Sequence, residues 1–149
     1  MTGLLVFLAI AALGLTAGAV LAEAMVLVPY WRSLPAAAFL ALYRQYGELL
    51  FRFYAPLEMV AFVLVVAAAS ASWLGGGAGT GFLVVAGTLS FLVPLSFPVY
   101  FQPVNASFAA ATIAPDDVPD ELARWARWHW MRVGLGTGSF LASIAAAAA

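Results

Sequence analysis

The chain has 149 residues, of which 65% are hydrophobic and 9% are charged, and its formal net charge is −1. Soluble domains carry about 25% charged residues and a chain of this size buries only about two-thirds of its surface, so these values exclude a soluble enzyme and a disordered protein. The six basic residues are all arginines, seven acids balance them, and cysteine is absent, which excludes a basic nucleic-acid-binding face, disulfides and thiolate metal sites. We therefore expect one integral membrane domain that covers residues 1–149.

Four segments are long and apolar enough to cross a bilayer, which takes about 20 residues. The first covers residues 3–28 and the second covers residues 56–74. The glycine cluster at 75–81 predicts a turn, after which the third span covers residues 82–100 and the fourth covers residues 128–149. The sequence therefore predicts an all-α, four-helix transmembrane bundle.

The arginines predict the orientation of this bundle. Five of the six lie in the two connections at 29–55 and 101–127, whereas the glycine turn and both ends of the chain have none. The positive-inside rule places arginine-rich connections in the cytoplasm. We therefore expect a multi-pass protein of the cell membrane with both connections cytoplasmic and both termini outside.

The two connections also contain predicted helices. In the first, charged residues recur every four positions from Arg44 to Arg52 on one face of an amphipathic segment at 35–54. This pattern predicts a helix that lies at the membrane interface and connects spans one and two. In the second, Asp117 followed by Pro119 is typical of a helix start. We expect this second helix to run without a break into span four.

Polar side chains within the spans form the candidate site. An ionisable group inside a bilayer costs about 2.5–3.5 kcal/mol on insertion scales and normally faces protein or a cavity. Each helix brings a polar side chain to the same depth near the cytoplasmic side, namely Glu23, Glu58, Asn105, His129 and Arg132. One interpretation is a substrate pocket open to the cytoplasmic leaflet, and the other is a Glu–Arg pair that closes a helix bundle.

A metal site is a further possibility for the same residues. Glu23, Glu58 and His129 are ligand types that suit iron, manganese or zinc. However, the chain has a single histidine and no Glu-x-x-His motif, and Arg132 lies close to His129, where its charge would repel a cation. We therefore expect no bound metal.

Small residues and prolines predict how the spans pack. One small-residue face begins at Gly14 and another at Gly134, each with a second glycine four positions later. Such faces let helices approach closely, either within the bundle or between copies in a homo-oligomer. Pro94 and Pro98 each remove a backbone donor, so we expect a distortion in span three.

Several motifs follow one another in a characteristic order along the chain. They are Pro29-Tyr30-Trp31 after the first span, Tyr43-Arg44-x-Tyr46 and Pro56 before the second, Pro103-Val104-Asn105 after the third, and Trp125-x-x-x-His129-x-x-Arg132 at the fourth. In order and spacing these motifs resemble the anthrone oxygenase family. Val118 departs from the pattern, because a tryptophan is expected at that position.

The resemblance implies a membrane enzyme that oxidises a flat, lipophilic phenolic or anthrone-like substrate with molecular oxygen and no cofactor. It implies that His129 is the general base and that Arg132 stabilises the anion formed from the substrate. Asn105 would hydrogen-bond to the substrate, and Trp125 would stack on its ring. Two alternatives remain: a non-catalytic protein that binds a small lipophile or packs as a subunit, and a metal-dependent membrane oxidoreductase.

Overall fold

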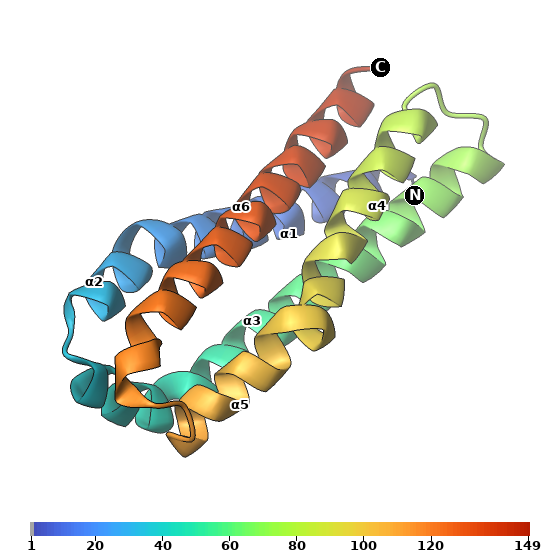
Figure 1. Cartoon of the computed structure of the whole chain (residues 1–149). Helices are drawn as coiled ribbons and strands as arrows, with labels where there is room; N and C mark the ends of the chain where they lie inside the picture. The colour runs from blue at the N-terminus through green and yellow to red at the C-terminus, as the bar shows by residue number, and fades with distance from the viewer. Residues whose placement is uncertain (1) are drawn as a thin grey trace.

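The chain forms an all-α bundle of four long helical segments, as predicted (Figure 1). The computed structural model describes residues 2–149. The four segments are Thr2–Ser33, Ala36–Leu74, Thr80–Ala110 and Pro115–Ala148. Each is long and apolar enough to cross a membrane, so the chain fits a lipid bilayer environment.

Two of these segments contain a π-helical turn. The first consists of α1 (Thr2–Ala22), the π-helical turn η1 (Glu23–Leu27) and α2 (Val28–Ser33). The third consists of α4 (Thr80–Ser96), the π-helical turn η2 (Phe97–Phe101) and α5 (Gln102–Ala110). The second segment is the single helix α3 (Ala36–Leu74), and the fourth is the short 3₁₀ turn η3 (Pro115–Asp117) followed by α6 (Val118–Ala148).

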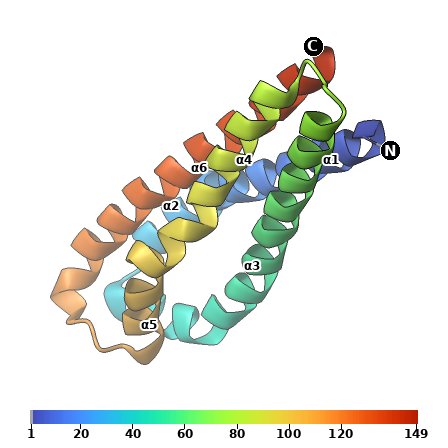
Figure 2. The ribbon, with the colours of Figure 1, turned by 90° about the vertical axis from the view of Figure 1, so that its right-hand side faces the viewer.

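The helices pack as a closed ring. α1 packs against α3 and α6, and α4 packs against the same two helices. Figures 1 and 2 show both termini and the turn between α3 and α4 at one end of the bundle, and the connections 34–35 and 111–114 at the other. The chain therefore runs along the length of the bundle four times, in alternating directions.

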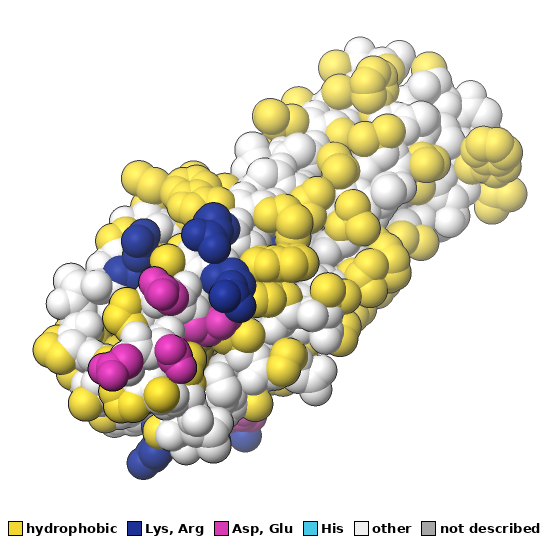
Figure 3. Space-filling view, viewed as in Figure 1, with side chains coloured by type: hydrophobic (Ala, Val, Ile, Leu, Met, Phe, Trp, Pro, Cys, Tyr) yellow, Lys and Arg dark blue, Asp and Glu magenta, His cyan; other side chains and the backbone are white. Residues whose placement is uncertain are grey.

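Charged side chains gather at the second of these ends (Figure 3). Apart from Glu23, Glu58 and Arg132, all charged residues fall within 32–52 or 116–127. We call this end of the bundle the charged end. Large apolar side chains such as Leu15, which is 68% exposed, cover the outside of the remaining length, as expected for helices that face lipid.

The helices extend further at the charged end than the sequence predicted. α3 is continuous through Pro56, so the amphipathic segment at 35–54 forms its first half rather than a separate interfacial helix. Its apolar side chains Phe39 and Tyr43 are buried in an aromatic core with Trp31. This half of the helix is held to the bundle by its packing on other helices. The helix remains continuous at Pro56, although the proline cannot donate a backbone hydrogen bond.

The other predicted helix features have mixed outcomes. The prediction of one helix through Trp125 into span four is confirmed by α6, and Asp117 occupies the N-cap position without a capping hydrogen bond from its side chain. A Cβ added at Gly14 would lie 3.0 Å from Phe140, so this glycine allows close packing within the chain. Gly18 and Gly134 have no such neighbour within 4 Å among the described residues.

Candidate functional site

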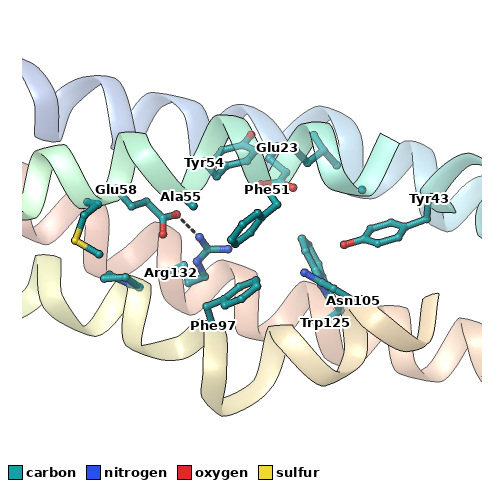
Figure 4. A pocket seen from close by; sticks show the side chains of 14 residues that line it. Glu23, Tyr43, Phe51, Tyr54, Ala55, Glu58, Phe97, Asn105, Trp125 and Arg132 are labelled. Carbon is teal, nitrogen blue, oxygen red and sulfur yellow. Dashed lines mark hydrogen bonds and ion pairs between the residues drawn. The ribbon is translucent and has the colours of Figure 1, made fainter. Parts of the chain in front are cut away.

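A cavity of about 250 Å³ lies between the helices near the charged end. All four helical segments contribute to its lining, and Figure 4 shows how their side chains converge. The polar groups in the lining are Glu23, Tyr43, Tyr54, Glu58, Asn105 and Arg132, and most of the other lining residues are apolar or aromatic. The structure therefore brings four of the five polar residues that the sequence placed at one depth to this cavity, namely Glu23, Glu58, Asn105 and Arg132.

Arg132 and Glu58 form an ion pair across the cavity wall (Figure 4). Their side chains are only 8% and 6% exposed, and Arg132 Nη2 donates to Glu58 Oε1. The guanidinium carbon lies 4.8 Å from the centroid of the Phe101 ring, a favourable cation–π distance. The Nε of Arg132 is buried and has no hydrogen-bond partner within residues 2–149, so the ion pair with Glu58 does not satisfy every donor of this guanidinium.

Glu23 opens the π-helical turn η1 and lines the cavity, although its side chain is only 4% exposed. Its Oε2 lies 3.7 Å from His129 Nε2, which is longer than a hydrogen bond. Beside it in Figure 4 is Tyr54, whose hydroxyl donates to the carbonyl of Ala19. π-helical turns frequently occur at functional sites, where they change the direction of side chains, and Glu23 occupies such a turn.

His129 is enclosed and does not line the cavity, contrary to the expectation that it acts there directly. Its ring stacks on Trp125 at 4.9 Å between centroids and an angle of 13°. Its Nε2 lies 2.9 Å from the carbonyl oxygen of Val20. Because a carbonyl only accepts, Nε2 carries the hydrogen, and Nδ1 is left without a partner among the described residues.

Trp125 and Asn105 lie together on one side of the cavity. Trp125 Nε1 donates to Asn105 Oδ1 at 2.9 Å, which leaves the amide N–H groups of Asn105 available to a ligand. One face of Trp125 is covered by His129, and the rings of Trp31 and Phe101 meet it edge-on. Trp125 lines the cavity, but these neighbouring rings leave it only 3% exposed.

The aromatic wall of the cavity is made by Phe51 and Phe97, which the sequence analysis missed. Their rings lie 5.1 Å apart at an interplanar angle of 33°, and both line the cavity. One signal for Phe51 exists in the sequence, because it precedes Glu58 by seven residues and therefore shares its face of a helix. Phe97 opens the π-helical turn η2, so counting along a regular helix does not place it.

The cavity adjoins a shallower hollow between α3 and α5 that extends to the charged end. This hollow has a volume of about 340 Å³ and shares Phe51, Phe97 and Asn105 with the cavity lining. Gly47 lies where the two meet, and a Cβ at this position would lie only 2.8 Å from the ring of Tyr43. The absence of a side chain at Gly47 therefore leaves room for the Tyr43 ring at this opening.

The metal site considered from the sequence is not assembled. Within residues 2–149, no three His, Cys, Asp or Glu side chains lie close enough together to hold a metal ion. Glu58 is instead paired with Arg132. Of the three expected ligands, only Glu23 and His129 lie side by side.

Comparisons with protein-family models, with curated proteins and with solved structures find no match for this chain. The chemistry available to the cavity follows from its own side chains. A carboxylate can accept a proton, a guanidinium can stabilise an anion, and aromatic walls favour a flat apolar molecule. These properties suit a lipophilic ligand with one weakly acidic group.

Proposed function

We propose that this protein is a multi-pass membrane enzyme that oxidises a flat, lipophilic phenolic or anthrone-like substrate with molecular oxygen and without a cofactor. The observation that carries the proposal is the cavity, which Glu23, Arg132 and the Phe51–Phe97 wall line together. The sequence motifs that resemble the anthrone oxygenase family support the same reaction. The arginines of the charged end favour a cytoplasmic location for that end, with both termini outside.

The proposed reaction begins with removal of a proton from an acidic methylene of the substrate. The Glu23 carboxylate accepts this proton, and the carbanion left behind is delocalised as an enolate whose oxygen lies against Arg132. The anion passes one electron to molecular oxygen, and the two radicals combine to form a carbon–oxygen bond. The peroxide takes up the proton from Glu23 and then loses water, so that one methylene and one oxygen molecule become one ketone and one water.

This proposal moves the role of general base from His129 to Glu23. Glu23 lines the cavity, whereas the ring of His129 is buried and its Nε2 donates to a backbone carbonyl. The imidazole lies 3.7 Å from the Glu23 carboxylate, so His129 acts as a positioning residue behind the base. Arg132 keeps its expected role because its side chain lines the cavity, and Asn105 keeps its role through its amide N–H groups.

The entry path follows from the solubility of such a substrate. A flat phenol partitions into the bilayer, and the hollow between α3 and α5 leads from the charged end to the cavity. Phe51 is 45% exposed, so its ring is accessible from outside the bundle. We propose that the substrate enters between these helices and lies with its ring against the Phe51–Phe97 wall.

Oxygen consumption tests this proposal directly. Purified protein in lipid nanodiscs is supplied with a panel of anthrones and related phenols, and dissolved oxygen and product absorbance are followed together. We expect one oxygen molecule consumed per ketone formed, without an added metal, flavin or haem. No oxygen uptake above the protein-free control on any member of the panel would reject the oxygenase.

Binding without turnover is the second candidate function. It is favoured by the buried Glu58–Arg132 pair and by the hydrogen bond from His129 to Val20, which satisfy polar groups as a purely structural core would. In that case the protein retains a flat phenol through purification and quenches its fluorescence, but consumes no oxygen. The oxygen electrode therefore separates the two candidates.

A further inference from the structure

We infer that the outer surface of the bundle carries a binding site for the headgroup of an anionic phospholipid. The site is a groove of about 640 Å³ between the η1–α2 segment and α6. Its lining shares no residue with the cavity described above. It is therefore separate from the proposed oxygenase site and does not depend on that proposal.

Two arginines face this groove from opposite walls. Arg32 lies in the last turn of α2 and Arg127 lies on α6, and both are exposed. No aspartate or glutamate lines the groove, and within residues 2–149 neither arginine forms an ion pair, whereas Arg52 and Arg124 do. Two guanidinium groups that are not neutralised by carboxylates are the arrangement that recognises a phosphate.

The floor of the groove and its edge away from the charged end are apolar. Val28 and Ala126 are buried beneath it, while Met25 is 60% exposed and Trp130 is 48% exposed at its edges. Tryptophan is enriched at the level of lipid headgroups, and Met25 lies further from the charged end, where an acyl chain would run. A free phosphate has no use for this apolar surface, so the combination of groups fits a phospholipid.

General attraction of the charged end to an anionic membrane would not make the protein select an anionic phospholipid. The two connections at 29–55 and 101–127 contain five arginines and five acids, so their formal charges cancel. Figure 3 shows basic and acidic side chains side by side at the charged end. Selectivity for an anionic lipid must therefore come from the local pair Arg32 and Arg127, in a basic pocket between transmembrane helices.

Native mass spectrometry of lipids retained by the intact protein tests the site. The protein is released from nanodiscs of phosphatidylcholine mixed with phosphatidylglycerol, and its bound lipids are counted for the wild type, for Arg32→Gln/Arg127→Gln and for Arg52→Gln/Arg124→Gln. The last variant removes the same charge from the same end but leaves the groove intact. We expect the wild type and this control to retain one phosphatidylglycerol. We expect the groove variant to bind it more weakly by at least about tenfold, because it loses the charge-assisted hydrogen bonds to the phosphate.

Three results would overturn the site. The wild type could show no preference for phosphatidylglycerol over phosphatidylcholine, or the two double variants could lose phosphatidylglycerol equally, which would indicate surface charge alone. Displacement of the lipid by an equal concentration of inorganic phosphate would indicate a site for the free anion. Both substituted arginines are exposed, and unchanged thermal unfolding in the groove variant shows that its fold is intact.

Discussion

Arg132 and Glu58 are two charged residues whose side chains are almost completely buried. Each is costly to bury alone, and their attraction offsets that cost only while both are present. The sequence predicted that Glu23 or Glu58 would lie within reach of this arginine, and the pair with Glu58 confirms it. The pair also fixes one side of the cavity, because both residues line it.

Loss of one member of this pair should destabilise the protein strongly. Arg132→Ala leaves the Glu58 carboxylate buried without a counter-charge, and we expect the free energy of unfolding to fall by about 3–5 kcal/mol. Arg52→Ala is the matched control, because Arg52 pairs with Glu48 on the exposed face of α3, and exposed pairs contribute about 0.2–1 kcal/mol. Equal shifts for the two variants in denaturation of the detergent-solubilised protein would contradict the buried pair.

At the scale of the helices, the face of α6 was predictable from the sequence. Its regular geometry carries the 3.6-residue period from Trp125 to Ser143, and the polar and small residues that this period places on one face are all buried. They are Trp125, His129, Arg132, Gly136, Ser139 and Ser143. The π-helical turns were harder to predict from the sequence. Pro98 indicated a distortion in span three, but no proline or glycine lies in the turn from Glu23 to Leu27.

A close helix contact near the glycine turn gives a prediction for the packing of α4 on α6. A Cβ added at Gly79 would overlap the backbone carbonyl of Ala146, whereas one at Gly81 would meet no atom within 4 Å. We expect Gly79→Ala to destabilise the protein by about 1–3 kcal/mol through overpacking. Gly81→Ala should be neutral or slightly stabilising, because alanine favours a helix over glycine by about 0.5–1 kcal/mol.

The same thermal unfolding assay measures both glycine variants. If both alanines shift the midpoint equally, α4 and α6 do not meet at Gly79 as described. The contact also explains the glycine at this turn in physical terms. Gly79 precedes α4 and has an ordinary φ of −76°, so space rather than backbone conformation requires it.

At the scale of the whole molecule, the distribution of arginines predicts the orientation. Five arginines lie in the connections at the charged end, which the positive-inside rule keeps in the cytoplasm. An alkaline phosphatase reporter, which is active only outside the cytoplasm, should therefore be active when fused after Ala149. An inactive phosphatase together with a fluorescent cytoplasmic reporter at the same position would reverse the orientation.

The four spans and the shared depth of the polar groups followed from the sequence, whereas the walls of the cavity did not. Depth depends on counting residues along each helix, and it placed Glu23, Glu58 and Arg132 together. Rotation of one helix against another depends on packing, which no single periodicity encodes. For this reason the sequence did not predict that His129 would be buried with a hydrogen bond to the carbonyl of Val20, or that the rings of Phe51 and Phe97 would be in contact.

The proposed role of Glu23 as the base of a cofactor-independent oxygenase is tested by the oxygen uptake of matched carboxylate variants. Glu23→Gln keeps the shape of the side chain but cannot accept the proton, so we expect turnover to fall by about 10²–10⁴-fold, the usual contribution of a positioned base. Asp120→Asn also turns a carboxylate into an amide, but at the exposed start of α6, away from the cavity and the hollow, and it should leave turnover unchanged. His129→Phe should lose less activity than Glu23→Gln, because its ring lies behind the carboxylate. Wild-type turnover in Glu23→Gln, or a larger loss in His129→Phe, would contradict the claim.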